Sequence, residues 1–147
     1  MRFVHTNIIA ADWRRLSKFY QTVFGCTPIS PKRDLSGEWV EKLTGIPGAK
    51  IEGEHLQLPG FGGKAPTLEI FSYTNANRID RRINNCGFSH IAFEVDDVKQ
   101  YADLIVAEGG ALIGEIVSTE ITGMGVVTVV YAGDPEGNII ELQSWDA

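Results

Sequence analysis

The sequence predicts an α+β fold made of two similar halves, each consisting of a strand, a helix and further strands. The sequence contains an internal repeat. In each half the first strand begins with a His, and the last strand carries a Glu at the matching position. The chain has 147 residues, and each half holds only about 60 to 75 of them, a size at which an isolated core is marginal. We therefore expect one domain over residues 1–147, with repeats at approximately 1–75 and 86–147, a linker at 76–85 and a shared core.

The opening strands of the two halves have the same pattern. The first runs from His5 to Asp12 and the second from His90 to Asp97, so each starts on His and ends at an Asp. An Asp in that place caps a helix by accepting hydrogen bonds from its first backbone amides. Apolar residues at helical spacing follow in both halves and stop at glycine: Trp13, Leu16, Tyr20, Val23 and Phe24 before Gly25, and Val98, Tyr101, Leu104 and Ile105 before Gly109.

The closing strands also align residue for residue. Residues 67–73 read TLEIFSY and residues 139–145 read IIELQSW, which superimposes Glu69 on Glu141. Because side chains alternate along a strand, the apolar neighbours of each Glu lie on the face opposite to it. We expect one face of each sheet to pack on a helix and the other face to carry His or Glu.

The segments between helix and closing strand differ in length. In the second half, a strand at 126–131 leads through a tight turn at 134–138 into the closing strand. In the first half, we expect a short helix at 38–44 and a strand at about 50–58. A polar stretch, residues 75–85, joins the halves.

Composition excludes several classes of protein. Apolar residues make up 44% of the chain, charged residues 22%, and no uncharged apolar run approaches the roughly 20 residues of a membrane-spanning helix. A net charge of −6 argues against nucleic acid as a partner. Cys26 and Cys86 are too few for a disulfide scaffold, which favours a reducing, cytoplasmic location without membrane attachment.

Four ionisable residues stand at positions equivalent under the repeat: His5, Glu69, His90 and Glu141. If the two halves face each other, the four side chains meet. Imidazole and carboxylate suit a divalent transition metal, and four such ligands leave two octahedral positions for water or substrate oxygens. The sequence therefore predicts a metal site open to substrate.

Three stretches resemble a known family. Residues 87–98, residues 134–142 and the pattern of Phe19-Tyr20 before Phe24-Gly25-Cys26 are similar to the vicinal oxygen chelate superfamily, which includes glyoxalase I, methylmalonyl-CoA epimerase, extradiol dioxygenases and bleomycin-resistance proteins. The resemblance covers nearly the whole chain. It implies two βαβββ modules forming a half-open barrel around one metal, commonly in a homodimer, and a small-molecule substrate that binds the metal through vicinal oxygens.

The ligand set narrows the activity that this resemblance implies. Bacterial glyoxalase I matches all four ligand types, and methylmalonyl-CoA epimerase differs in having Gln where Glu69 stands. Both move a proton on the carbon next to a carbonyl through a metal-bound enediolate, so we predict a metal-dependent isomerase, epimerase or lyase of the glyoxalase type. Glu141 is the first choice for the base, with Glu69 as the second base or proton donor. Residues 34–50 resemble a subgroup containing cyclitol-ketone epimerases, which favours a hydroxy-ketone substrate.

The sequence allows several alternatives for the metal, the source of its ligands and the reaction. The metal can be Ni, Co, Zn, Mn or Fe, and the four ligands can come from one chain or two. His55, Glu38 and Glu41 are further candidates near the site. The alternatives are a protein that keeps the metal site but sequesters a ligand, or another metal-dependent reaction such as dioxygenation. Glu69 weighs against the latter, because a fourth ligand fills the position that oxygen activation needs open.

Overall fold

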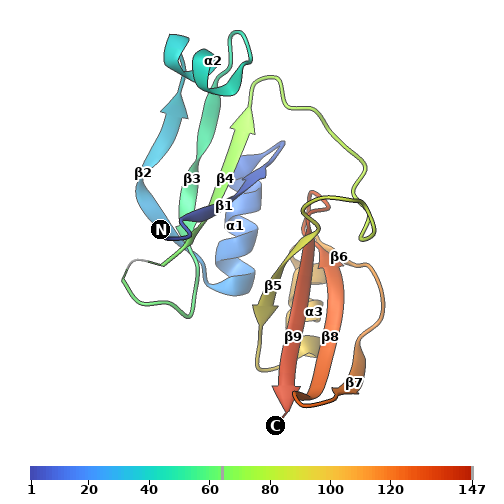
Figure 1. Cartoon of the computed structure of the whole chain (residues 1–147). Coiled ribbons are helices and arrows are strands. Elements are labelled where there is room, and N and C mark those ends of the chain that lie inside the picture. Colours follow the sequence, from blue (N-terminus) through green and yellow to red (C-terminus); the bar gives the residue numbers. More distant parts are fainter. Residues whose placement is uncertain (64, 147) are drawn as a thin grey trace. The chain divides into compact units, whose positions relative to one another are not determined.

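The computed structural model describes residues 1–63 and 65–146, which form two compact units, Met1–Arg78 and Ile79–Ala147 (Figure 1). The boundary between the units falls inside the polar stretch that the sequence marks as the joining segment. Each unit contains one open mixed sheet.

The first unit contains four strands and two helices among its described residues. In chain order they are β1 (His5–Ile9), α1 (Trp13–Phe24), β2 (Thr27–Leu35), α2 (Glu38–Thr44), β3 (Ile51–Gln57) and β4 (Thr67–Tyr73). The strands lie in the order β1-β4-β3-β2, with β1 parallel to β4 and the other pairs antiparallel. The first and last strands of the repeat are thus neighbours, which places His5 and Glu69 on adjacent strands.

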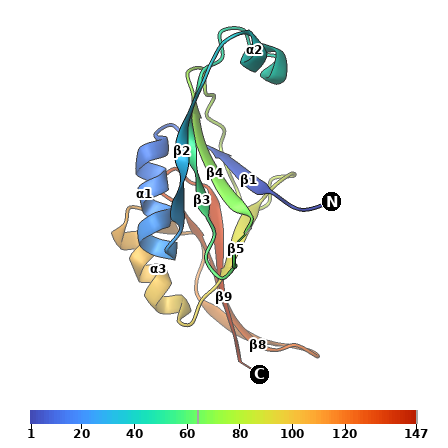
Figure 2. The ribbon, with the colours of Figure 1, turned by 90° about the vertical axis from the view of Figure 1, so that its left-hand side faces the viewer.

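Helix α1 begins and ends where the sequence predicts. The Asp12 side chain accepts hydrogen bonds from the backbone amides of Arg14 and Arg15, and Gly25 ends the helix in the left-handed conformation at φ 67°. The apolar face of α1 packs on β3 and β4, on one side of the four-stranded sheet (Figure 2). The opposite side of that sheet is therefore the one that carries His5 and Glu69.

The second unit repeats this plan. It contains β5 (His90–Glu94), α3 (Val98–Ala107), β6 (Ala111–Leu112), β7 (Val117–Ile121), β8 (Gly125–Gly133) and β9 (Ile139–Asp146). The order is β5-β9-β8-β6, with β7 also paired to β8 and β5 parallel to β9. Asp97 caps α3 by accepting a hydrogen bond from the Gln100 amide. The predicted repeat of strand, helix and further strands is confirmed.

The hairpin between β8 and β9 is organised by a buried carboxylate. One Asp134 side-chain oxygen accepts hydrogen bonds from the backbone amides of Glu136 and Asn138, and the other accepts one from the Asn138 side chain. Gly137 adopts a φ of 81°, which favours glycine. The turn predicted at 134–138 is confirmed.

The alternation of burial along the closing strands is also as predicted. In β4, Leu68 and Ile70 are fully buried on the helix side, and in β9 Ile140 and Leu142 are buried in the same way. The intervening Glu side chains consequently lie on the opposite faces of their sheets.

Strand β2 is the first strand after the helix in the βαβββ plan, but the residue pattern did not predict its bounds. It contains Pro28 and Pro31, which lack the backbone amide a central strand needs, and it lies at the edge of the sheet, where this is tolerated. Its register against β3 shifts between Ile29 and Arg33. The residue pattern did not predict the bounds of the short strands β6 and β7 either.

Helix α2 has the predicted bounds. It contributes Val40 to a buried apolar cluster with Ala49, Ile51 and Phe71. Because Ile51 and Phe71 belong to β3 and β4, α2 covers one end of the sheet of the first unit. Among the described residues, no helix is long and apolar enough to span a membrane.

Candidate functional site

The first unit brings His5 and Glu69 together. In the parallel pairing of β1 and β4, His5 lies opposite Thr67 and Asn7 lies opposite Glu69. The His5 Nε2 atom is 3.4 Å from Glu69 Oε2, and the Asn7 amide donates a 2.9 Å hydrogen bond to the same oxygen. Both partners come from β1, on the face opposite α1. Two of the four predicted site residues therefore lie together in the first unit.

His55 is a third member of this cluster. It lies directly opposite Glu69 in the antiparallel pairing of β3 and β4, and its Nε2 atom is 3.0 Å from Glu69 Oε1. Its Nδ1 atom is 3.1 Å from the Thr67 hydroxyl, and the His5 and His55 rings are 5.8 Å apart between centroids. His55, a further candidate near the site, is thus in contact with the predicted ligand Glu69.

The surroundings of His55 favour its neutral form. Burial lowers the pKa of His55 below its usual value, and the positive charges of Arg33 and His5 add to that effect. The Glu69 carboxylate acts in the opposite direction. In the neutral form Nε2 carries the proton that faces the Glu69 carboxylate, and the lone pair of Nδ1 faces the Thr67 hydroxyl.

The second unit holds the corresponding pair. His90 Nε2 is 3.2 Å from Glu141 Oε2, between the parallel strands β5 and β9. Tyr131 lies directly opposite Glu141 in the pairing of β8 and β9. A hydrogen bond between the Tyr131 side chain and Glu141 raises the pKa of Tyr131. The His90 and Tyr131 rings are 5.1 Å apart between centroids.

The two clusters occupy the same positions in the two sheets. In each, an opening strand supplies His, the parallel closing strand supplies Glu, and the antiparallel neighbour supplies the residue opposite that Glu. The equivalent residues are His5 and His90, Glu69 and Glu141, His55 and Tyr131, and Asn7 and Ala92. The repeat therefore extends to side chains that sequence alignment left unmatched, and it is asymmetric, with imidazole in one half and phenol in the other.

Each His and Glu pair has the spacing of two ligands of one ion. Two donors that bind a transition metal at about 2.1 Å and at a right angle lie about 3.0 Å apart. The observed separations are 3.4 Å in the first unit and 3.2 Å in the second. Across residues 1–63 and 65–146, no group of three or more His, Cys, Asp or Glu side chains is arranged to hold an ion. Within the described residues, each unit thus brings together one His and Glu pair.

Glu38 and Glu41 have structural partners in the described chain. Glu38 pairs with Lys42 along α2 at 2.6 Å, and Glu41 accepts a 3.0 Å hydrogen bond from the Gly48 amide. Both interactions stabilise α2 and the turn that follows it. The structure does not bring either carboxylate into the cluster around Glu69.

These sheets, with a His and Glu pair on the face away from each helix, define an α+β fold of two similar modules. The model of the glyoxalase/bleomycin resistance protein/dioxygenase superfamily matches residues 2–142, and the chain belongs to this family.

Individual relatives agree with the family. A probable lactoylglutathione lyase from Vibrio parahaemolyticus is 26% identical over 141 residues, covering 96% of this chain and 88% of the relative. A crystal structure of a glyoxalase family protein from Bacillus cereus matches all of this chain and 94% of its own, with a TM-score of 0.75 at 18% identity. A glyoxalase I mutant from Zea mays has a TM-score of 0.63 at 26% identity, covering 97% of this chain and 44% of its own. The predicted family and its α+β two-module fold are confirmed.

Proposed function

We propose that this protein is a divalent-metal-dependent isomerase or epimerase of the glyoxalase type, which moves a proton on the carbon next to a carbonyl. The observation that carries the proposal is the His and Glu pair found at equivalent positions in both units. Relatives named lactoylglutathione lyase, such as the one from Vibrio parahaemolyticus, support the same class of reaction.

The proposed ligands are His5, Glu69, His90 and Glu141, two from each unit, in one chain or shared between two. A bound Ni, Co, Zn, Mn or Fe ion would act as a Lewis acid toward the vicinal oxygens of the substrate and so acidify the neighbouring C–H bond. The donor set fits such an ion, because both pairs have suitable spacing and mixed nitrogen and oxygen atoms. The ligand spacing does not distinguish among these metals.

The chain's own residues carry the proton. Glu141 is the proposed base that removes the proton, and Glu69 is the second base or the donor that returns it. Their surroundings differ in a way that fits this division. Both Glu69 oxygens are engaged, by Asn7 and His5 on one side and His55 on the other. Glu141 has one such contact fewer, with His90 and Tyr131, so we assign the first proton transfer to Glu141.

We also propose a cellular location, an oligomeric state and a class of substrate. We place it in the cytoplasm as a homodimer, acting on a small molecule with vicinal oxygens, with hydroxy-ketones as the first class to test. Cys26 and Cys86 are both free thiols, which is compatible with a reducing compartment.

The experiment that tests the function combines metal analysis with proton exchange. We expect gently purified protein to contain about one transition-metal ion per site and to melt at a lower temperature after chelation. We also expect solvent deuterium to enter a recovered hydroxy-ketone or 2-oxo substrate at the carbon next to the carbonyl. Metal without exchange would favour a sequestering protein, and incorporation of molecular oxygen would favour a dioxygenase.

Substitution of the two carboxylates separates the proposed base from a merely structural residue. Glu141→Gln and Glu69→Gln should each reduce exchange by about 10²- to 10⁴-fold. Glu52→Gln is the matched control, because Glu52 lies on β3 but pairs with Arg14 on the opposite face. Full activity in both site variants would overturn the assignment.

A further inference from the structure

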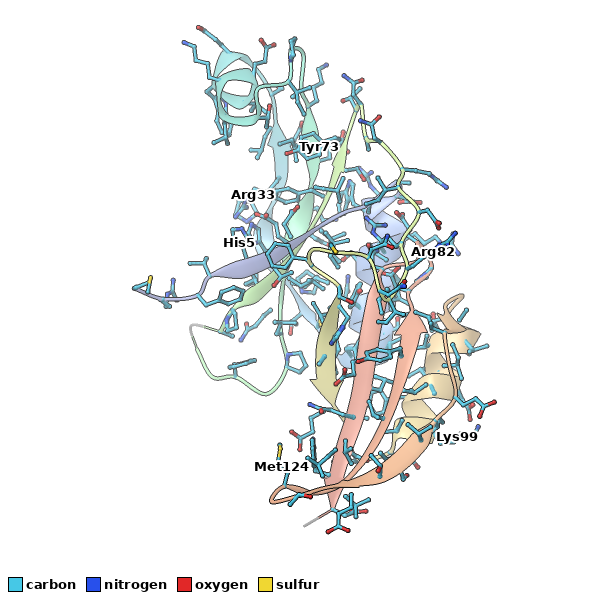
Figure 3. The ribbon with its side chains drawn as sticks, turned by 45° about the vertical axis from the view of Figure 1, so that its right-hand side comes forward. His5, Arg33, Tyr73, Arg82, Lys99 and Met124 are labelled. Carbon is cyan, nitrogen blue, oxygen red and sulfur yellow. The ribbon has the colours of Figure 1, made fainter. Side chains whose placement is uncertain are left out.

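Arg33 lies on the same face of the first sheet as the His55 and Glu69 pair. In the pairing of β2 with β3, Ile29 is opposite His55 and Arg33 is opposite Gly53. Arg33 is the first paired residue after the register shift in β2. Irregularities of this kind re-aim side chains and are common beside active sites. Figure 3 labels the Arg33 and His5 side chains on the first unit.

The Arg33 guanidinium has few partners for a charged group that is half-buried. One of its nitrogens donates a hydrogen bond to the Pro31 carbonyl. Within residues 1–63 and 65–146, no carboxylate forms an ion pair with it. A guanidinium has five N–H donors and stays charged at every physiological pH. Most of its donors therefore remain available to a ligand.

The position of this charge is unfavourable unless an anion joins it. Along β3, His55 lies two residues from Gly53, the residue opposite Arg33, and on the same face of the sheet. The carboxylate of the same cluster, Glu69, already has contacts with Asn7, His5 and His55. A half-buried cation on the same face as the His55 and Glu69 pair, with no ion pair to a carboxylate of the described chain, is the arrangement expected of an anion site.

Neighbouring basic residues differ from Arg33 in this respect. Lys32 precedes it in β2 and its ammonium lies over the Trp13 ring, 5.3 Å from the centroid. Arg14 also lies over that ring and pairs with Glu52 at 3.2 Å. Both cations interact with Trp13 on α1, whereas Arg33 lies on the sheet face that carries Glu69.

We propose that Arg33 binds an anionic group of the substrate, so that the substrate is a hydroxy-ketone or 2-oxo compound carrying a carboxylate or a phosphate. This inference rests on the proposed function for the vicinal oxygens and adds the charge of the substrate. Arg33 lies opposite Gly53, which is two residues, or about 7 Å, from His55 along β3. The anionic group accordingly lies a few bonds from the vicinal oxygens.

The next row of the sheet limits the length of the substrate. Leu35, Ile51 and Tyr73 pair across β2, β3 and β4, one row beyond Arg33, and belong to the apolar cluster closed by Val40 of α2. An anionic group that reached this cluster would lose its hydration without gaining a partner. Phe71, which pairs with Gly53 at the level of Arg33, also belongs to this cluster, so Arg33 lies at the border between the polar and apolar parts of this face.

The test compares the binding of charged and neutral ligands that share the same hydroxy-ketone skeleton. The probes are dihydroxyacetone phosphate against dihydroxyacetone, and 5-hydroxy-4-oxopentanoate against its amide. Dissociation constants are measured by ligand-observed NMR on the protein with the metal it carries after purification. We expect the charged member of at least one pair to bind about tenfold tighter or more, and the preferred pair identifies phosphate or carboxylate as the anion.

Variants assign the preference to Arg33. Arg33→Met should abolish the preference for the charged ligand, Arg33→Lys should keep part of it, and Lys32→Met, which removes the same charge from the other face, should leave it unchanged. Equal binding of charged and neutral ligands by the unmodified protein, or an undiminished preference in Arg33→Met, would overturn the inference.

Deuterium exchange in the same samples keeps the two proposals separate. A preference that depends on Arg33, without exchange, supports the anion site and contradicts the isomerase. Exchange that is equal for charged and neutral ligands and is unaffected by Arg33→Met supports the isomerase and contradicts the anion site.

Discussion

Gly53 is the position where a single methyl group should do most damage to the first unit. It lies in β3 opposite Phe71 of β4. A Cβ atom at this position would collide with the Ile70 carbonyl oxygen and with Phe71 Cδ1, and it would lie 2.9 Å from Phe71 Cα. Two of these three atoms belong to the backbone of β4, so a rotamer change cannot relieve the overlap. Strands β3 and β4 would have to separate locally.

The expected cost follows from that separation. Overpacking of a well-packed site typically costs 1 to 3 kcal/mol, and we expect about 3 kcal/mol for Gly53→Ala because the backbone must move. For a chain of this size, that corresponds to a melting temperature lower by roughly 6 to 12 °C. Since His55 is two residues further along β3, its contact with Glu69 should also weaken.

Thermal unfolding followed by circular dichroism measures the effect. Gly114→Ala is the control, because a Cβ at Gly114 has no atom within 4 Å and the residue has no positive φ. We expect the control to melt within about 2 °C of the unmodified protein. If Gly53→Ala were as stable as the control, the close approach of β3 and β4 at this position would be refuted.

Three further predictions concern other parts of the chain. At pH 8, iodoacetamide should modify exposed Cys86 and spare Cys26, because burial raises the Cys26 pKa to about 11 and leaves about one thiol in a thousand ionised; mass spectrometry should show one adduct per chain, and equal labelling of both would contradict the burial. Asp134→Ala should lower the free energy of unfolding in urea by about 2 to 4 kcal/mol, since three hydrogen bonds to a buried carboxylate are lost, and a change below about 1 kcal/mol would contradict that role. Asn7→Ala should weaken metal binding about 10-fold or more in a chelator competition, because the amide no longer orients Glu69, and unchanged affinity would show that this hydrogen bond does not support the site.

Local signals in the sequence were sufficient for much of the fold. Asp12 and Gly25 gave the bounds of α1, and the alternation around Glu69 and Glu141 gave the buried and open faces of both sheets. These features depend on residues close together in the chain, so period and capping chemistry reveal them. The resemblance implied a strand at the place of β2, but its bounds could not be predicted because two prolines mask the strand pattern and are tolerated only at the sheet edge.

The partners of the candidate residues depend on register, and the apolar alternation predicts which face a residue is on but not which residue lies opposite it. His55 contacts Glu69 because the antiparallel pairing of β3 and β4 places these two residues directly opposite each other. The connection between the two strands sets this register. The repeat alone therefore determined that a His and a Glu recur in each half. The cross-strand pairing of the folded sheets decided which side chains surround each Glu, because neighbours across a sheet are set by hydrogen-bond register and not by distance along the chain.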